Sequence, residues 1–362
     1  MTGRMTTGPL KFCCDVEQPV LMSVLAKRNW LRVEPDQDWN IYWASVAGVR
    51  AVFSADYGSR LSDHQRINHF ATHYELTRKD LMAKHMKRYR RELNKNSADG
   101  ESSGPIPDLV PPTFVLPRDY NMFVDEFRKT APSMWIVKPC GKAQGVGISL
   151  VSKPSQVKGL LNRWCSTATK HSDNRCGPRL NRLHVRIIFG VTSFAIQWLY
   201  IFLCLLVFSW PHPKRRTGSL VTAAPLGEAA AGVRSSAQHR TPAATSRYPA
   251  ASATSVTMDL HCSAFPCGTM LSDWHCFECY GYDILLDEQL RPWLLEVNAS
   301  PSLTCSTPGD WVLKETMLDD LFEIVAPRGE LRSARNAVPE PDRQGDFELL
   351  LPEDAAAATS KS

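Results

Sequence analysis

Two apolar runs, at residues 280–286 and 293–297, flank the polar stretch 287–291. Both runs are rich in aliphatic and aromatic residues, which favour paired strands. Apolar runs of this length around a short polar stretch predict a β-hairpin. Within the second run, Glu296 interrupts a series of Leu and Val residues. A carboxylate in a strand that is otherwise apolar needs a charged partner or a metal ion.

Three oxygen-bearing side chains fall on this hairpin. Because side chains alternate between the two faces of a strand, Glu296 and Asn298 point the same way, and Asp283 on the other strand can face them. Mg²⁺ takes such carboxylate and amide oxygens, and it usually shares its coordination shell with substrate phosphates. The hairpin therefore predicts a site for a nucleotide and its metal. The simpler alternative, a polar outer face on an ordinary hairpin, stays open on these residues alone.

A glycine-rich loop follows the apolar strand predicted at residues 134–139. The strand carries Lys138 near its end, and residues 140–150 are rich in glycine. Backbone N–H groups at glycines can approach phosphate oxygens closely, and a lysine beside them neutralises the phosphate charge. A second strand follows the loop, whereas the Walker loop places its lysine directly before a Ser or Thr at the start of a helix. The pattern indicates a different kind of phosphate-binding loop.

Helices are predicted at residues 78–93, 120–128, 155–164 and 311–325, and in the last of these apolar residues recur at helical spacing. Before them, residues 10–60 combine tryptophans with short apolar runs and predict a small α/β domain. The first helix is strongly basic. Its basic residues, with the one that follows, are Lys79, Lys84, Lys87, Arg88, Arg90, Arg91 and Lys95. They form either an ordinary solvated face or a surface for an acidic partner.

The middle of the chain follows none of these patterns. Residues 187–210 contain no charged side chain and are long enough to span a bilayer as a helix. A membrane-tethered protein is therefore an alternative, but a span here would separate Lys138 from Asp283, and we expect no membrane partner. Residues 211–258 are dominated by Ala, Ser, Thr, Pro, Gly and Arg, a composition that predicts disorder.

Composition sets wider bounds. A chain of 362 residues can hold two or three domains, and a net charge of +5 suits an acidic polymer partner. The eleven cysteines follow no apolar leader, so we expect reduced thiols. A zinc site is an alternative, because several possible ligands lie close together in the sequence. They are His261, Cys262, Cys267, His275, Cys276 and Cys279.

Several strings of residues together resemble one family. The strings GYDILLD and WLLEVNASPSL of the hairpin, KPCGKAQGVGI of the glycine loop, and INHF with LTRKDLMAKHMKRYRREL before it are similar to the tubulin-tyrosine-ligase-like enzymes, a branch of the ATP-grasp ligases. The resemblance implies an α/β (α+β) fold, in which a small N-terminal α/β domain precedes an ATP-grasp nucleotide domain. It also implies that Asp283, Glu296 and Asn298 hold the Mg²⁺ of MgATP.

The same resemblance assigns the phosphate-binding residues. Lys138 would reach the phosphates of ATP, and Glu296 and Lys138 would be the catalytic pair. The loop residues that would close over the nucleotide are Gln144, Gly145, Val146 and Gly147.

The nearest branch of the family is that of the tubulin polyglutamylases. The expected function is therefore ATP-dependent addition of glutamate to glutamate side chains of the acidic C-terminal tails of tubulin, through an acyl phosphate. Tubulin in microtubules and free glutamate are the expected partners, with no nucleic acid. The expected location is the cytoplasm and cytoskeleton, including the axoneme and basal body of a cilium or flagellum.

Residues 168–272 do not follow the family pattern, apart from 182–186, which resemble its Lys-Phe-Asp-Leu-Arg strand. We interpret the segment as a variant insert, such as alternative splicing produces. A catalytically incomplete isoform that only binds microtubules or ATP is therefore the alternative function. The expected order is an N-terminal α/β domain with the basic helix (10–95), a linker (96–112), a first ATP-grasp part (113–167), the non-family segment (168–272), the metal-binding hairpin with a C-terminal helix (273–326), and a mobile tail (327–362).

Overall fold

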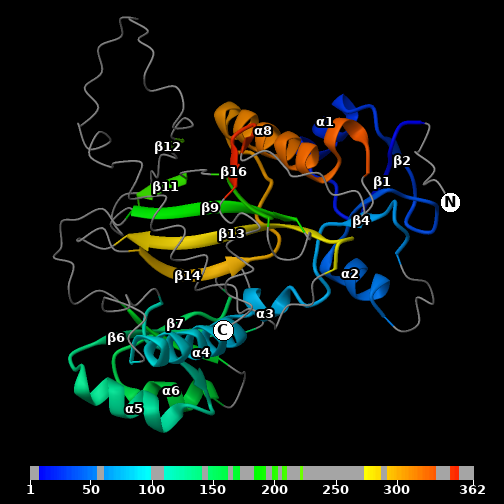
Figure 1. The fold of residues 1–362 in the computed structure, drawn as a ribbon. Coiled ribbons are helices and arrows are strands. Elements are labelled where there is room, and N and C mark those ends of the chain that lie inside the picture. The colour runs from blue at the N-terminus through cyan, green and yellow to red at the C-terminus, as the bar shows by residue number, and fades with distance from the viewer. Residues whose placement is uncertain are drawn as a thin grey trace, which may run out of the picture.

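The computed structural model describes residues 8–54, 61–98, 110–140, 146–161, 166–171, 183–192, 198–202, 206–209, 221–222, 273–286, 292–331 and 343–349. Within these ranges the strands form three sheets, with helices packed on their faces (Figure 1). The fold is therefore a mixed one of helices and sheets, as the sequence predicts.

The N-terminal sheet is small and parallel, in the order β2-β1-β3-β4. Its elements are β1 (Lys11–Cys14), α1 (Pro19–Lys27), β2 (Leu31–Arg32), β3 (Ile41–Trp43), α2 (Val46–Val52) and β4 (Arg66–Ile67). Helix α1 buries Val20, Leu21, Val24 and Leu25, which share one face at helical spacing. The small α/β unit predicted from the tryptophan-rich N-terminal stretch is confirmed.

A second sheet is antiparallel, in the order β5-β8-β6-β7. Its elements are β5 (Thr113–Leu116), α5 (Tyr120–Lys129), β6 (Met134–Pro139), β7 (Ser149–Val151), α6 (Pro154–Leu161) and β8 (Ser166–His171). Strand β6 alternates half-buried and buried residues, so Trp135 and Val137 enter the core while Lys138 faces the other way. The predicted strands around the glycine loop are confirmed, since β6 and β7 pair antiparallel.

The largest sheet has eight strands, and β9 lies at its centre (Figure 1). Its elements are β9 (Leu183–Thr192), β10 (Trp198–Phe202), β11 (Leu206–Ser209), β12 (Val221–Thr222), β13 (Phe277–Leu286), β14 (Pro292–Asn298), β15 (Arg343–Gln344) and β16 (Phe347–Leu349). Strands β13 and β14 pair antiparallel, which confirms the predicted hairpin. Strand β9 pairs with β13 along its whole length, from Leu183 opposite Leu286 to Thr192 opposite Phe277.

The strands of this sheet contradict the alternative of a membrane-spanning helix in the described part of residues 187–210. The described parts of that range are the strands β9, β10 and β11, not one helix. In the portion of the chain that the structure describes, no helix has the length and apolar character needed to cross a bilayer.

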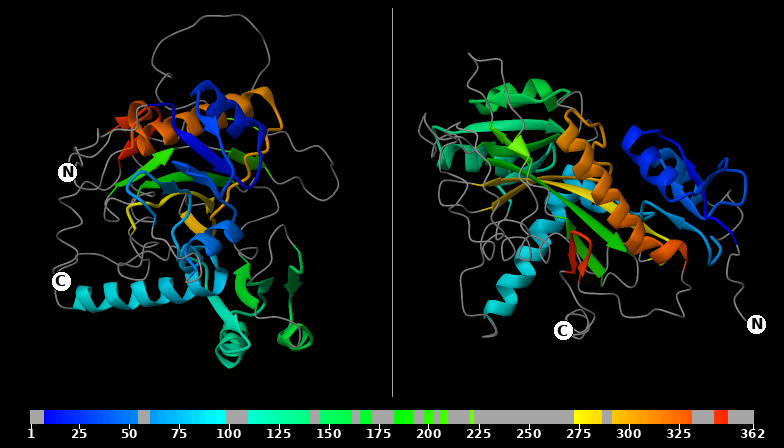
Figure 2. Two further views of the ribbon diagram at one scale, coloured as in Figure 1. Left: turned by 90° about the vertical axis from the view of Figure 1, so that its right-hand side faces the viewer. Right: turned by 90° about the horizontal axis from the view of Figure 1, so that it is seen from above.

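The remaining helices are α3 (Tyr74–Thr77), α4 (Lys79–Ala98), α8 (Pro308–Val325) and the short 3₁₀ helix η3 (Pro327–Gly329). Helix α8 begins at Thr307, whose hydroxyl accepts a hydrogen bond from the backbone N–H of Asp310, a usual N-cap arrangement. It packs against α1 and the largest sheet, and Figure 2 shows it running beside them. Helix α4 lies against β5 and β8 and extends away from the sheets.

The β13–β14 hairpin and the β5–β8 sheet belong to two separate hydrophobic cores. Tyr282, Leu294 and Val297 of the β13–β14 hairpin pack with the N-terminal sheet and α4. Phe123 and Trp135 belong to the core of the β5–β8 sheet instead. Lys138, on the face of β6 that points away from the second core, therefore meets Glu296 of β14 across the boundary between the two cores.

A buried polar contact joins the N-terminal part to β13. The Nδ1 atom of His69 lies 2.6 Å from Oε1 of Glu278, and their side chains are 2% and 0% exposed. Nearby, the backbone N–H of Ile67 donates to the carbonyl of His275. The segment that leads into α3 and α4 is thus attached directly to the strand that carries Asp283.

Candidate nucleotide site

Two lysines from different elements converge on one carboxylate. Lys79 lies at the start of α4 and Lys138 on β6, and their Nζ atoms lie 3.4 Å and 3.9 Å from Oε2 of Glu296 on β14. All three side chains are between about a sixth and a quarter exposed, so ligands in solution can still reach them. The geometry brings together the two residues that the sequence singled out as catalytic, Lys138 and Glu296.

The charges of this cluster change its protonation behaviour. Burial on its own raises the pKa of Glu296, but the positive charges of Lys79 and Lys138, with the adjacent Asp283, outweigh it and lower that pKa. The carboxylate is therefore ionised at neutral pH. Burial, only partly offset by Glu296, lowers the pKa of the Lys138 ammonium group. The site holds charge in a partly desolvated place, where electrostatic contacts are stronger than in bulk water.

The predicted metal ligands lie together on the hairpin. Asp283 is buried and pairs directly with Glu296 across the two strands, and Asn298 lies opposite Gly281, two residues further along β14. The Nδ2 atom of Asn298 is 3.5 Å from the carbonyl of Gly281, so its amide nitrogen faces the backbone and its Oδ1 is turned away from that carbonyl. Two carboxylates and an amide oxygen are a donor set that Mg²⁺ prefers, and these residues fit that ion.

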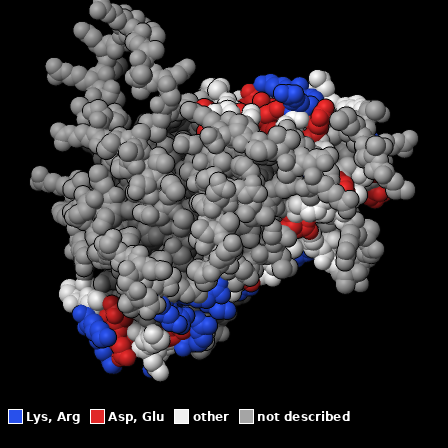
Figure 3. All heavy atoms as spheres, viewed as in Figure 1, with Lys and Arg blue, Asp and Glu red and all other residues white. Residues whose placement is uncertain are grey.

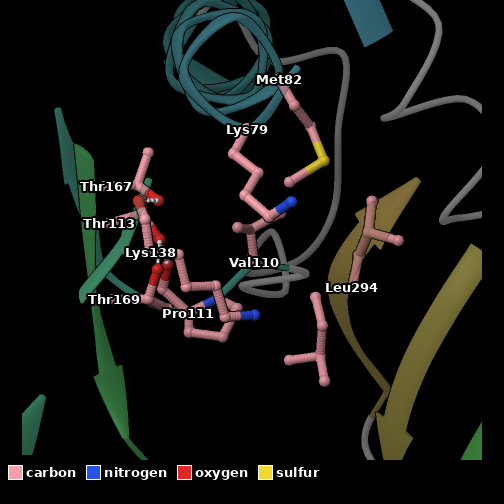
Figure 4. Close-up of a pocket in the computed structure, with 10 residues that line it drawn as sticks. Lys79, Met82, Val110, Pro111, Thr113, Lys138, Thr167, Thr169 and Leu294 are labelled. Atoms are coloured by element: carbon pink, nitrogen blue, oxygen red, sulfur yellow. Dashed lines mark hydrogen bonds between the residues drawn. The ribbon is translucent and has the colours of Figure 1, made fainter. Parts of the chain in front are cut away.

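A pocket of about 290 Å³, partly open to solvent, lies beside the cluster. One wall carries the hydroxyls of Thr113, Thr167 and Thr169, and the other carries apolar side chains. The lining residues are Lys79, Met82, Val110, Pro111, Thr113, Lys138, Thr167, Thr169, Leu294 and Leu295. In Figure 4 the two lysine side chains reach into this space, Lys79 from the helix and Lys138 from the sheet.

The end of the glycine loop is held close to β6. Gly147 has a φ of +77°, and a Cβ atom at this position would lie 2.9 Å from Cγ of Pro139. Both the backbone conformation and the close approach require glycine here. Val146 beside it is exposed. The other predicted loop residues, Gln144 and Gly145, lie outside the described residues.

Residues 182–186 resemble the family's Lys-Phe-Asp-Leu-Arg strand, and their described part, 183–186, forms the start of β9. Arg186, the last residue of this stretch, lies directly opposite Asp283 in the β9–β13 register. Arg182, its first residue, lies outside the described part. Residues 183–186 therefore lie in the sheet next to the β13–β14 hairpin.

Cysteines near the hairpin are free thiols. Cys276 and Cys279 are buried. Burial, with a smaller contribution from the negative charge of Glu278, raises the pKa of Cys279 to about 12. Across the described ranges, no group of three or more His, Cys, Asp or Glu side chains is placed to hold a metal. Three of the residues weighed as zinc ligands, His261, Cys262 and Cys267, lie outside those ranges.

Sequence reasoning missed Lys79 as a site residue. Lys79 is one of seven basic residues between 79 and 95, and its position in the sequence does not distinguish it from the other six. The structure reveals its role, because Lys79 is the first residue of α4 and follows a short helix that contacts β14. Thr167 and Thr169 were also not predicted, because they reach the site through the pairing of β8 with β5 and β6, which joins distant stretches of the chain.

Comparison with known proteins places this site in a family. Residues 58–175 and 252–333 match the model of the tubulin-tyrosine ligase family. The chain belongs to the tubulin-tyrosine ligase family. The two matched ranges contain Lys79 and Lys138 on one side, and Asp283, Glu296 and Asn298 on the other.

Relatives from several organisms extend this match over nearly the whole chain. The chain is 33% identical to "Probable alpha-tubulin polyglutamylase Ttll1" of Tetrahymena thermophila, over 96% of this chain and 94% of that protein. It is 30% identical to "Probable tubulin polyglutamylase TTLL9" of Bos taurus, over 91% of this chain and 81% of that protein. The family resemblance predicted from the sequence motifs is confirmed.

A solved structure supports the fold of this family member. The C-terminal domain of Pby1 from K. lactis, an ATP-grasp enzyme, superposes with a TM-score of 0.58, at 13% identity, over 95% of this chain and 99% of that domain. The chain thus has an ATP-grasp-like fold, as predicted. In that fold the two-lysine cluster of this tubulin-tyrosine ligase family member lies between the β5–β8 sheet and the β13–β14 hairpin.

Proposed function

We propose that this chain is an ATP-dependent ligase that joins glutamate to glutamate side chains on the acidic C-terminal tails of tubulin. The observation that carries the proposal is the convergence of Lys79 and Lys138 on Glu296, which pairs with Asp283. This cluster lies in a chain whose fold is ATP-grasp-like and whose relatives are named tubulin polyglutamylases.

The proposed reaction has two steps. In the first, the terminal phosphoryl group of ATP passes to the acceptor carboxylate, which forms an acyl phosphate and releases ADP. In the second, the neutral amino group of the incoming glutamate attacks the acyl carbon. The new amide bond forms, inorganic phosphate leaves, and the amine loses a proton to solvent.

The residues of the cluster have distinct tasks in the first step. Lys79 and Lys138 would bind phosphate oxygens and stabilise negative charge on the transferring group, so their contribution is positional and electrostatic. Mg²⁺, held by Asp283, Glu296 and Asn298, would offset further charge on the phosphates. Gly147 allows the end of the glycine loop to lie close to Pro139 of β6.

The charges of the cluster suit this role. Oε2 of Glu296 lies 3.4 Å from Nζ of Lys79 and 3.9 Å from Nζ of Lys138. Phosphate oxygens would replace the carboxylate as the partner of each lysine, and the carboxylate would then be available to the metal.

The decisive test is incorporation of labelled glutamate into microtubules by the full 362-residue chain with MgATP. We expect incorporation that depends on ATP and appears on tubulin. If the chain pellets with microtubules but incorporates no glutamate, the protein is instead the binding-only isoform. If it neither pellets nor incorporates, tubulin is not its acceptor.

A pH profile provides an independent test of Lys138. Its lowered pKa means that the ammonium group loses its proton at a lower pH than the ordinary value near 10.4. Since only the charged form attracts phosphate, we expect ATP affinity to fall as the pH rises through that lowered pKa. Lys138→Arg should bind ATP with an affinity that holds at alkaline pH, because a guanidinium stays protonated. Titrations of a fluorescent ATP analogue between pH 7 and 10.5 would measure this, and identical profiles for both proteins would contradict it.

A further inference from the structure

His85 is a buried polar side chain that the proposed chemistry does not use. It lies on α4 and is only 5% exposed, and its Nε2 atom lies 2.7 Å from Oε2 of Glu75 on the preceding helix α3. Nε2 donates this hydrogen bond and the carboxylate accepts it. A polar group in the interior needs such a partner, because burying it unpaired is costly. The bond therefore joins α3 to α4 at a largely buried place.

The two helices that this bond joins meet at a single extended residue. Helix α3 ends at Thr77, and Arg78 has φ −81° and ψ 127° before α4 begins at Lys79. Because this backbone conformation is not helical, the direction of α4 relative to α3 depends on contacts between the two helices. The bond between Glu75 and His85 spans this junction, since the two residues are 10 apart in the sequence.

Burial along α4 is confined to its first turns. Among the side chains of this helix that the structure describes, Met82, Ala83 and His85 are buried. The rest of the helix extends away from the sheets (Figure 2), and Figure 3 shows Lys and Arg side chains on the surface around it. Apolar burial has no preferred direction, whereas a hydrogen bond has a preferred geometry. His85 therefore supplies the directional contact in this small buried set.

Helix α3 is in turn fixed to the strand that carries the site carboxylate. It has only four residues, too few to be stable alone, and it contacts β14. Leu76 of α3 packs in the same core as Leu294 of β14. Lys79 returns from α4 to this strand, with its Nζ atom 3.4 Å from Oε2 of Glu296. The elements α3, α4 and β14 thus form a closed set of contacts, in which His85 links the two helices.

We infer that His85 and Glu75 are positioning residues for Lys79 at the nucleotide site. Their hydrogen bond holds α4 in the direction that keeps the ammonium group of Lys79 beside Glu296, where it would bind phosphate oxygens. Neither residue lines the pocket beside the cluster, so their effect on ATP binding passes through Lys79. The inference rests on the proposed function, in which Lys79 binds phosphate, and it adds the contact that places this lysine.

The test is a double-variant cycle in the full-length chain. His85→Leu removes the donor and keeps an apolar side chain of similar size, Lys79→Met removes the ammonium group, and a third protein carries both changes. Binding of a fluorescent ATP analogue with Mg²⁺ is measured at a temperature where circular dichroism shows every protein to be folded. His64→Leu is the matched control, because His64 also pairs with a carboxylate, that of Asp38 at 3.2 Å, and does not line the pocket.

We expect His85→Leu to bind the analogue about tenfold more weakly than the wild type, and His64→Leu to stay within about twofold. In the Lys79→Met background, His85→Leu should change the affinity by less than about twofold, because no ammonium group is left to position. His85→Gln should stay within about threefold of the wild type, since its side-chain amide can donate to Glu75 in place of Nε2.

Three results would overturn the inference. A tenfold loss that persists in the Lys79→Met background would show that His85 acts through the general stability of the site. His85→Gln as weak as His85→Leu would show that the hydrogen bond to Glu75 is not what matters. Unchanged affinity in His85→Leu, or no binding of the analogue by the wild type, would mean that the contact does not serve nucleotide binding.

Failure of this inference can be told apart from failure of the proposed function. Binding of the ATP analogue requires neither tubulin nor glutamate, whereas glutamate incorporation requires both. A chain that shows the coupling between His85 and Lys79 but incorporates no glutamate keeps the inference and rejects the ligase. A chain that incorporates glutamate and shows no such coupling keeps the ligase and rejects the inference.

Discussion

Replacing Glu296 with glutamine is expected to reduce ATP-dependent glutamate incorporation by about a hundredfold or more. The substitution keeps the size of the side chain but removes the charge that Lys79 and Lys138 face at 3.4 Å and 3.9 Å. It also removes one of the two carboxylates of the expected Mg²⁺ site. Removing one preorganised group that stabilises charge in a transition state, such as an oxyanion-hole donor, costs about 10²–10³ in rate, and we expect a similar loss here. The measurement is labelled glutamate on microtubules at saturating MgATP.

A matched control exists on α8. Glu315 also pairs with a lysine, with Lys27 Nζ at 2.8 Å, and is about as exposed as Glu296. Glu315→Gln should leave incorporation within about twofold, since a surface ion pair contributes little to stability. If Glu296→Gln keeps more than a tenth of the wild-type rate while Glu315→Gln is normal, Glu296 does not serve the reaction, and the site lies elsewhere.

Local patterns in the sequence were sufficient to predict the pieces of this site. Two apolar runs around a short polar stretch predicted the hairpin, and side-chain alternation allowed Asp283 to face Glu296 and Asn298; the register confirms that Asp283 and Glu296 pair. The apolar strand before the glycines predicted the position of Lys138, and the structure confirms that strand. Each of these signals depends on residues within one short stretch of chain.

The parts that sequence could not predict depend on contacts between distant stretches. Lys79 meets Glu296 because α4 packs into the core of the hairpin through Met82 and also lies against β5 and β8, and these contacts leave no local mark in the sequence. The pairing of β9 with β13 is similar. It brings residues 183–192 beside 277–286, although a long segment without recognisable pattern separates them.

The contact between His69 and Glu278 is the clearest case of such a distant interaction, and removing it is expected to destabilise the protein by about 3–5 kcal/mol. In His69→Ala, Glu278 would remain fully buried after losing the partner that lies 2.6 Å away. Breaking a buried pair from one side is costly because the remaining charge is not compensated. Urea unfolding of the full chain, followed by tryptophan fluorescence, would measure the change, since Trp39 lies in the same core as Ile67 and Tyr282.

Two further variants separate the pair from a general effect of losing a histidine. His64 pairs with Asp38 at 3.2 Å, but its side chain is 44% exposed, so His64→Ala should cost no more than about 0.5 kcal/mol. The double variant His69→Ala with Glu278→Leu removes both polar groups and should recover part of the loss. A single variant as stable as His64→Ala would show that the buried contact contributes nothing.

The pair also connects stability to the proposed chemistry. His69 precedes the segment that leads into α4 and Lys79, while Glu278 lies on the strand that carries Asp283. Losing the contact would loosen the attachment between these two elements, and Lys79 would no longer be held against Glu296. We therefore expect His69→Ala to weaken ATP binding as well, even at a temperature where the protein stays folded. Unchanged ATP affinity in a folded His69→Ala protein would mean that α4 is positioned by its packing against β5 and β8 instead.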